Sequence, residues 1–427
     1  MPAPHPHPVT PSTPPAATPW VVSRLSAMMI LEYASLGLWI VTVGAFLSAN
    51  TGAAGSGMFS AGFIGLAATS QALGSLFAPV LVGVAADRFF RSERLLAGLH
   101  AVCVGCLWLM CTAPTQAAFY AALLVYFQAY APTGTLANSL SLRHLPEAEH
   151  TFALVRSLGT VGWIAAGVAV GYLWPALFGR GIEATLVPLK LAAVTHAVTA
   201  LYCLTLPETR PLQRGGVGWR LLAGSGHLLR DRGFLVFLAI SLLMTAPSQF
   251  YNSFVNPFLN QTGFGHPAAK LTLGQAAEVG CLLLLPALMA RFGLRRLLLV
   301  GGAAWGVRFA MLAAYGYTGL WIAYPAILLH GVSFVFVYIA GQLYADRVAS
   351  RDARAAAQGL YMLATGGLGH LLGSILGQYS QAALLTPEGV DPAPYRWGAF
   401  WLIPCGCSLL ACVLAAAFFR EAARKRS

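Results

Sequence analysis

The chain has 427 residues, of which 57% are hydrophobic and only 9% are charged, and its mean hydropathy is +0.68. A soluble domain carries roughly 25% charged residues, so this composition excludes a soluble globular protein. The formal net charge of +12 could indicate nucleic-acid binding, but no stretch of this apolar chain matches a nucleic-acid-binding fold. We therefore expect an all-α membrane protein that lies in a lipid bilayer and has no nucleic-acid partner.

The first segment of the chain is polar and rich in proline. Residues 1–21 lack the charged start and the apolar run of a signal peptide. We predict that they form a disordered tail, and that residues 421–427 form a short basic tail at the other end.

Runs of about 20 apolar residues, the length that crosses a bilayer as a helix, recur along the rest of the chain. The longest polar interruption, 208–233, separates six runs within 22–207 from six within 234–420, which predicts two six-helix bundles joined by a linker. The twelve predicted spans lie near 24–47, 57–84, 93–113, 116–142, 151–176, 187–206, 234–260, 271–292, 294–315, 318–345, 355–380 and 397–419.

Basic residues predict the orientation, because Lys and Arg accumulate in cytoplasmic loops. Apart from Arg156 and Arg308, which lie deep within spans, only Arg180, Lys190, Lys270 and Arg396 fall on one side, whereas the other 20 Lys and Arg residues fall on the opposite side. We therefore expect both termini and the linker to be cytoplasmic, in a multi-pass protein of the cytoplasmic (inner) membrane.

A basic turn follows the second span of each half: GVAADR at 83–88 and RFGLRR at 291–296. With two six-helix halves, this pattern resembles the major facilitator superfamily, whose loop between helices 2 and 3 carries G-x-x-x-D-R. The resemblance implies two bundles that rock about a substrate site near the midplane. Asp87 and Arg88 are expected to act at the cytoplasmic gate, where Asp87 can pair with basic groups of neighbouring helices.

Polar residues inside the fifth span form the first candidate site. Arg156, Thr160 and Trp163 occur at i, i+4 and i+7 and so share one helix face. A charged group within a bilayer is costly and usually faces a cavity, and an Arg offers five donors in a fixed plane to hydroxyl or carbonyl groups. The alternative is an Arg that pairs with an intramembrane acid and holds helices together.

Amides and carboxylates in three further spans extend this site. Gln249 and Asn252, with Asn256 further along, are expected to line one face of the seventh span, although bonding between helices is a plain alternative. Gln275 and Glu278 share a face of the eighth span. Burial raises the pKa of a carboxyl group and a nearby cation lowers it, so Glu278 can take up and release a proton as Arg156 or the substrate moves. Glu32 in the first span is a second candidate for the proton-coupling group.

The aromatic residues and the cysteines say less about function than the polar residues within the spans. Eight aromatic residues are expected to fall on spans around a central cavity: Trp163, Tyr130, Phe250, Tyr251, Phe334, Phe336, Tyr338 and Tyr361. The eight cysteines all fall within spans, where Cys acts as a small apolar residue. Cys103 and Cys106 have redox or zinc spacing without a second pair, so we expect no metal site and no cofactor.

Several short runs, in order, give a more specific resemblance. The chain resembles bacterial nucleoside:proton symporters of the major facilitator superfamily, which implies nucleoside binding by Arg156, Thr160, Trp163, Gln249, Asn252, Gln275, Glu278 and Phe334. The runs are WIVTVGAFL (39–47), GVAADR (83–88), AYAPT (129–133), RSLGTVGW (156–163), FVNPFL (254–259), QAAE (275–278), AWGVRFA (304–310) and AAAQGLYM (355–362).

One part of the tenth span departs from that pattern. The family has an Asp directly after the Phe, where this chain has Val335, and an Asn where it has Tyr338. The loss of that carboxylate puts the substrate range and the proton coupling in question. Glu32 or Glu278 is then expected to supply the titrating group.

We expect a monomeric transporter of nucleosides, driven by protons. One alternative is a facilitator for another polar solute, such as a sugar, a modified nucleoside or a nucleoside-like antibiotic, without coupling. A membrane-embedded enzyme or a sensor is a third class, but the chain shows no nucleophile with a base, no metal set and no soluble output domain.

Overall fold

The computed structural model describes residues 19–52, 56–145, 149–211, 226, 228–350, 353–384 and 396–420. These residues form helices joined by turns, together with an isolated β-bridge between Thr51 and Phe59. Helices are the expected form in a bilayer, because they satisfy every backbone polar group within the segment. The predicted tails at 1–21 and 421–427 and the linker at 208–233 lie mostly outside the described residues.

The first bundle comprises the helices of the N-terminal half. They are α1 (Pro19–Ile40), α2 (Val43–Ala49), α3 (Phe63–Arg88), α4 (Ser92–Thr112), α5 (Gln116–His144), α6 (Glu149–Val168), the π-helical η1 (Ala169–Leu173), α7 (Trp174–Phe178) and α8 (Val187–Cys203).

The second bundle comprises the helices of the C-terminal half, which follow the short 3-10 turn η2 (Leu228–Arg230). They are α10 (Arg232–Thr245), α11 (Ser248–Gln261), α12 (Pro267–Ala313), α13 (Tyr315–Thr318), η3 (Leu320–Ile322), α14 (Ala323–Phe334), η4 (Val335–Ile339), α15 (Ala340–Val348), α16 (Arg354–Met362), η6 (Leu363–Gly369), α17 (His370–Leu384) and α18 (Trp397–Phe418).

The twelve predicted spans are recognisable among the described helices. Within the described ranges, eight helical segments are long and apolar enough to cross a membrane. One of them, α12, has 47 residues and a break at Gly293, where φ is 75°, so it contains two of the predicted spans. The helices α3, α5 and α8 supply the other three, and the predicted fold of two six-helix bundles is confirmed.

Local sequence accounts for several boundaries of these helices. Thr115 begins α5 by accepting a hydrogen bond from the amide of Ala118, and the carboxylate of Asp231 caps α10 in the same way. Pro247 separates α10 from α11, because proline lacks the amide hydrogen that would continue the helix. Within the tenth and eleventh spans, the π-helical turns η4 and η6 shift the helix register beside the cavity described below.

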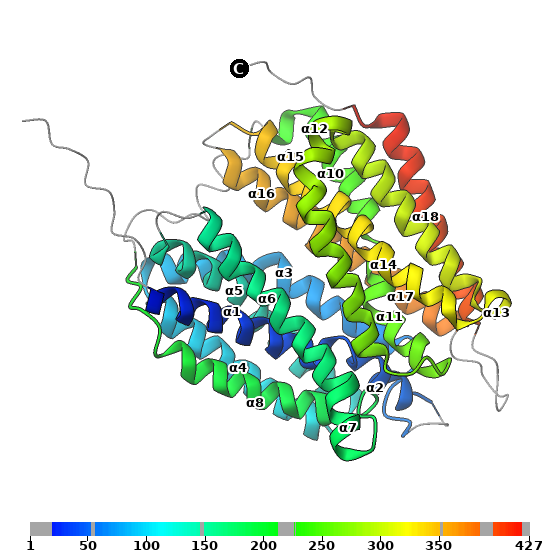
Figure 1. The fold of residues 1–427 in the computed structure, drawn as a ribbon, viewed down its shortest axis with the longest axis horizontal. Coiled ribbons are helices and arrows are strands. Elements are labelled where there is room, and N and C mark those ends of the chain that lie inside the picture. The colour runs from blue at the N-terminus through cyan, green and yellow to red at the C-terminus, as the bar shows by residue number, and fades with distance from the viewer. Residues whose placement is uncertain are drawn as a thin grey trace, which may run out of the picture.

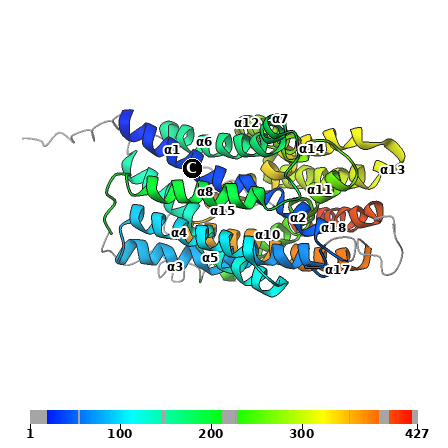
Figure 2. The same cartoon turned by 90° about the horizontal axis from the view of Figure 1, so that it is seen from below.

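The two bundles are inclined to each other (Figure 1), and the blue α2 lies beside the yellow-green α11 in Figures 1 and 2. The hydrogen bonds that join described side chains of one bundle to the other lie at the end where these two helices meet, which we call the closed end. There Gln381 accepts hydrogen bonds from the amides of Ile64 and Gly65. Gln261 donates to Ser48 at the same end. The basic turns lie at the opposite end, which we call the basic end.

Glycines allow the close approach of helices at the closed end. A Cβ at Gly44 of α2 would lie 2.6 Å from the carbonyl oxygen of Ser253 in α11, and one at Gly62 would lie 2.8 Å from that of Gln378 in α17. Both distances are shorter than a van der Waals contact, so no larger residue fits without a shift. Gly65, Gly373 and Gly377 likewise lie against neighbouring helices, where an added Cβ would meet Gln378, Ala246 and Phe254.

Candidate functional site

A cavity of about 380 Å³ lies between the two bundles. This volume falls within the roughly 300–1,000 Å³ that is typical of small-molecule sites. Helices of both bundles line it, so a ligand here would contact both bundles. The polar and aromatic lining residues are Tyr33, Trp39, Gln71, Phe127, Arg156, Thr160, Trp163, Ser248, Tyr251, Asn252, Ser253, Gln275, Glu278, Trp305, His330, Phe334, Tyr338 and His370.

The predicted face of α6 points into this cavity. Arg156, Thr160 and Trp163 all line it, because residues four and three apart lie on one side of a helix. The Arg156 guanidinium carbon lies 4.5 Å from the ring centroid of Tyr33 on α1. Among the described residues no ion pair joins Arg156 to an acid, so its donors are free to meet a ligand.

The predicted amide face of α11 divides into three environments. Asn252 lines the cavity. Gln249 lies behind it, almost completely buried, and its Oε1 accepts a 3.0 Å hydrogen bond from Asn252 Nδ2. Asn256 does not face the cavity; its Nδ2 donates to Glu183 of the other bundle at 2.7 Å. For Asn256 the alternative of bonding between helices therefore holds, and this residue does not extend the cavity face.

The acid and the amide of α12 face α6 across the cavity. Gln275 and Glu278 both line it, and Trp305 reaches the same cavity from beyond the break at Gly293. Gln275 Oε1 is buried and has no hydrogen-bond partner among the described residues. A carboxylate, an amide and a guanidinium thus converge on one space.

An aromatic wall completes the cavity on the side of α14 and η4. The Phe334 ring stacks between those of His330 and Tyr338, with centroid distances of 5.5 and 4.9 Å. Next to His330, Tyr251 carries the buried Arg308 on its face, 3.2 Å from guanidinium carbon to centroid. Of the aromatic residues expected at the cavity, Trp163, Tyr251, Phe334 and Tyr338 line it, whereas Tyr130, Phe250, Phe336 and Tyr361 do not.

The model for the nucleoside H+ symporter family matches residues 20–424 of this chain. The chain belongs to that family. It is 34% identical to the putative nucleoside transporter YegT of Escherichia coli over 93% of this chain and 94% of the relative. It is 28% identical to the xanthosine permease of the same organism, over 92% and 94%.

Solved structures support the fold of this symporter family member. The crystal structure of the nucleoside transporter NupG in its D323A form superposes with a TM-score of 0.83 at 24% identity, over 94% of this chain and all of that one. A POT-family peptide transporter, at 12% identity, superposes with a TM-score of 0.70. These relatives are transporters rather than enzymes.

Sequence reasoning missed one hydrogen-bonded group in this symporter. The Tyr338 hydroxyl lies 2.7 Å from Ser248 Oγ and 2.7 Å from His370 Nε2. Val335, which stands where the family pattern has an acid, is fully buried at the start of η4. Ser248 and Tyr338 were visible as polar residues of spans, but His370 lies in a glycine-rich run that indicates only packing.

Two groups of predicted residues lie elsewhere. Glu32 does not line the cavity; it is buried within the first bundle, where it contacts His100. The backbone of Asp87 and Arg88 ends α3, but their side chains lie outside the described part of the structure, and the gate remains a prediction.

The eight cysteines are free thiols, and no group of described side chains could hold a metal ion.

Proposed function

We propose that this protein is a nucleoside:proton symporter that binds its substrate in the central cavity and transports it by alternating access. The observation that carries this proposal is the meeting of Arg156 with Gln275 and Glu278 in one cavity lined by both bundles. A substrate held by both bundles stabilises their joint closure, which is the movement that transport requires.

The chemistry of the lining suits a nucleoside. Arg156 offers a planar set of donors, Glu278 accepts hydrogen bonds from sugar hydroxyls, and the amides of Asn252 and Gln275 can both donate and accept. A nucleobase presents both hydrogen-bond donors and acceptors along its edge, so such amides suit it. The aromatic wall around Phe334 and the indole of Trp163 supply faces on which a base can stack. Thr160 completes the set, and Gln249 holds Asn252 in position.

The orientation is part of the proposal. The basic end faces the cytoplasm, with both termini and the 208–233 linker on that side. The closed end then faces away from the cytoplasm, so this structure represents the state in which the cavity is sealed from outside. We further propose that the transporter works as a monomer, because each chain contributes both bundles that line the site.

The decisive experiment is uptake by proteoliposomes that contain the purified protein. A panel of radiolabelled nucleosides and monosaccharides is tested with and without an imposed inward proton gradient. We expect saturable uptake of one or more nucleosides that the gradient stimulates. Uptake of a monosaccharide in preference to every nucleoside would replace this proposal with the polar-solute alternative.

Matched variants tie uptake to the cavity. Arg156→Ala and Gln275→Ala are expected to abolish nucleoside uptake while the protein stays folded in the membrane. Val161→Ala on α6 and Leu283→Ala on α12 are the controls, because these side chains are exposed on the outer surface of the same helices. Equal uptake by Arg156→Ala and Val161→Ala would exclude this cavity as the nucleoside site.

A further inference from the structure

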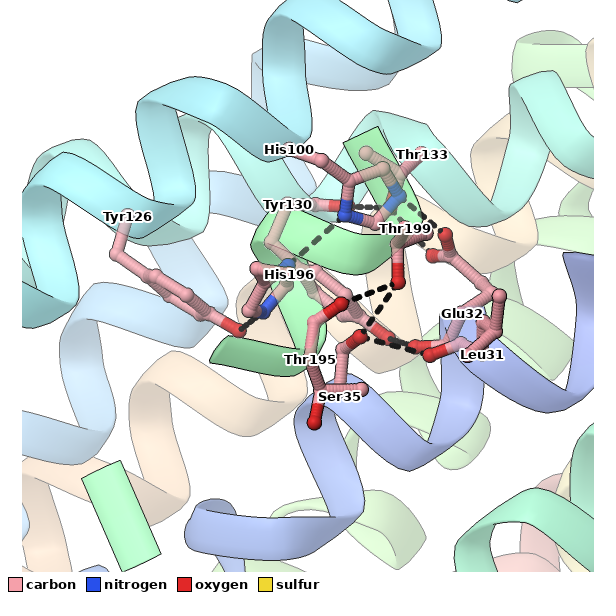
Figure 3. Close-up of polar contacts among 10 residues, drawn as sticks. All are labelled: Leu31, Glu32, Ser35, His100, Tyr126, Tyr130, Thr133, Thr195, His196 and Thr199. Atoms are coloured by element: carbon pink, nitrogen blue, oxygen red, sulfur yellow. Dashed lines mark hydrogen bonds and ion pairs between the residues drawn. The ribbon is translucent and has the colours of Figure 1, made fainter. Parts of the chain in front are cut away.

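A chain of hydrogen bonds runs through the interior of the first bundle, away from the central cavity (Figure 3). Glu32 Oε2 lies 2.8 Å from His100 Nε2, and His100 Nδ1 lies 2.8 Å from His196 Nδ1. His196 Nε2 lies 2.9 Å from the Tyr126 hydroxyl, which accepts a 3.2 Å hydrogen bond from the indole of Trp39. All five side chains are buried, at 1% exposure or less.

Counting hydrogens fixes the direction of each bond. Trp39 can only donate, so the Tyr126 hydroxyl accepts from Trp39, and its own hydrogen is satisfied when it is donated to His196 Nε2, the other described partner of this hydroxyl. A neutral His196 then carries its hydrogen on Nδ1 and donates to His100. A neutral His100 donates from Nε2 to Glu32. Every bond in the chain is satisfied when both histidines are neutral and Glu32 is a carboxylate.

In this arrangement the five hydrogen-bonded side chains together carry one negative charge inside the bilayer. The hydroxyl of Thr133 lies 2.5 Å from Glu32 Oε1 and 2.6 Å from the carbonyl oxygen of Tyr130; the carboxylate is the stronger acceptor. Other titratable groups near Glu32 are Tyr33 from α1, Cys103 from α4, Tyr126 and Tyr130 from α5 and Cys203 from α8. None of these is a cation, and an unpaired buried charge is costly.

One additional proton removes that charge without moving any heavy atom. With the proton added, His100 donates from both nitrogens, to Glu32 and to His196. His196 then carries its hydrogen on Nε2 and donates to Tyr126, so the bonds on either side of His196 reverse. The carboxylate and the imidazolium of His100 form a neutral pair, and the one bond given up among the described residues is that of the Tyr126 hydroxyl hydrogen, which no longer has His196 Nε2 as its acceptor.

The hydrogen-bonded chain of side chains reaches the central cavity through α1. Trp39 begins the chain and also lines the cavity, and Tyr33, the residue after Glu32, lines it beneath Arg156. A substrate that contacts Arg156 or Trp39 therefore acts on the helix that carries Glu32. The direct contact between His100 and His196 leaves no space for a metal ion between the two rings.

We propose that Glu32, His100 and His196 together form the binding site of the transported proton. The inference rests on the proposed symport and assigns its proton to the first bundle instead of the carboxylate of Glu278 in the cavity. Glu278 then acts in substrate binding.

The test compares two activities of the same proteoliposomes. Nucleoside counterflow at equal pH exchanges labelled for unlabelled substrate and needs no net proton movement, whereas symport acidifies the lumen, which a trapped pH-sensitive dye reports. Glu32→Gln and His100→Gln are expected to retain counterflow and to lose nucleoside-driven acidification. Ser35→Ala is the control: Ser35 lies one turn from Glu32 and contacts Thr199, outside the chain (Figure 3). It should retain both activities.

Thr133→Val provides a second test that preserves side-chain shape. Removal of the hydroxyl takes a donor from the Glu32 carboxylate, so the proton-free state is destabilised and the proton is held more tightly. The pH at which uptake is half-maximal should shift upward. Acidification by Glu32→Gln at the wild-type rate, or an unchanged pH profile in Thr133→Val, would overturn the assignment. Wild-type protein that transports no nucleoside would instead refute the proposed function.

Discussion

The Glu183 carboxylate, in the loop before α8, accepts a 2.7 Å hydrogen bond from Asn256 Nδ2 on α11 and so joins the two bundles at the closed end. The same carboxylate accepts from Asn260 at 3.2 Å and from the backbone amide of Ala268 in the first turn of α12 at 3.1 Å. Three donors of the second bundle thus converge on one acceptor of the first. This arrangement stabilises the state that is sealed at that end.

We predict that Glu183→Gln weakens the closed end. The amide nitrogen of Gln would face donors, and the loss of a buried charge-assisted hydrogen bond costs about 1.5–3 kcal/mol. The distance between spin labels on cysteines at 181 and 265 should lengthen in a background free of other cysteines. Both positions are exposed glycines where a Cβ meets nothing within 4 Å.

Glu208→Gln serves as the matched control for that experiment. Glu208 forms ion pairs with Arg91 and Arg210 on the exposed surface of the first bundle, where such pairs contribute little. It should leave the label distance unchanged. A distance distribution in Glu183→Gln equal to that of the wild type would show that the carboxylate does not hold the closed end.

Gly44→Ala is predicted to open the same end by a steric route. Its Cβ would meet the Ser253 carbonyl and the Pro257 ring, and overpacking of this kind costs about 1–3 kcal/mol. The same label pair reports the change. Gly98→Ala on α4 is the control, because a Cβ there has open space; similar distances in the two variants would contradict the steric account.

Arg156→Lys is predicted to lower nucleoside counterflow about tenfold or more, equivalent to at least about 1.4 kcal/mol. A lysine keeps the charge above Tyr33 but loses the planar fork of donors. Tyr33→Phe keeps the ring face under Arg156 and should stay close to the wild-type rate. Counterflow by Arg156→Lys at the wild-type rate would mean that charge alone is recognised.

Tyr338→Phe is predicted to alter substrate preference more than folding. Without the hydroxyl, Ser248 and His370 lose a shared partner, which costs about 1–3 kcal/mol when the groups are buried. The expected result is a changed ranking of nucleosides in the uptake panel, with a modest fall in melting temperature. A uniform loss for every nucleoside would indicate a purely structural role.

Sequence patterns predicted the architecture because apolar run length and helical spacing are local properties. Arg156, Thr160 and Trp163 share a face in any regular helix, so their common environment could be predicted. Gln249 and Asn256 could not be separated from Asn252 in this way. Their partners depend on where Pro247 starts α11 and on Glu183, a residue in a loop far away in the sequence.

The buried chain in the first bundle shows the other limit. Glu32 was identifiable as a charge within an apolar run, but a single histidine on an apolar helix gives no sign of its partner. His100 and His196 lie 96 positions apart, and only the packing of α4 against α8 brings their rings together.

Because the described hydrogen bonds between the bundles lie at one end only, we expect the transporter to bind substrate differently from the two sides of the membrane. From the state seen here, a substrate on the closed side can enter only after Glu183, Gln261 and Gln381 have released their partners. A substrate on the basic side meets no such set of bonds between described side chains. The apparent affinities for substrate measured from the two faces of the membrane should therefore differ even with no gradient. The smaller the fraction of protein that is open to one face, the weaker the apparent binding from that face.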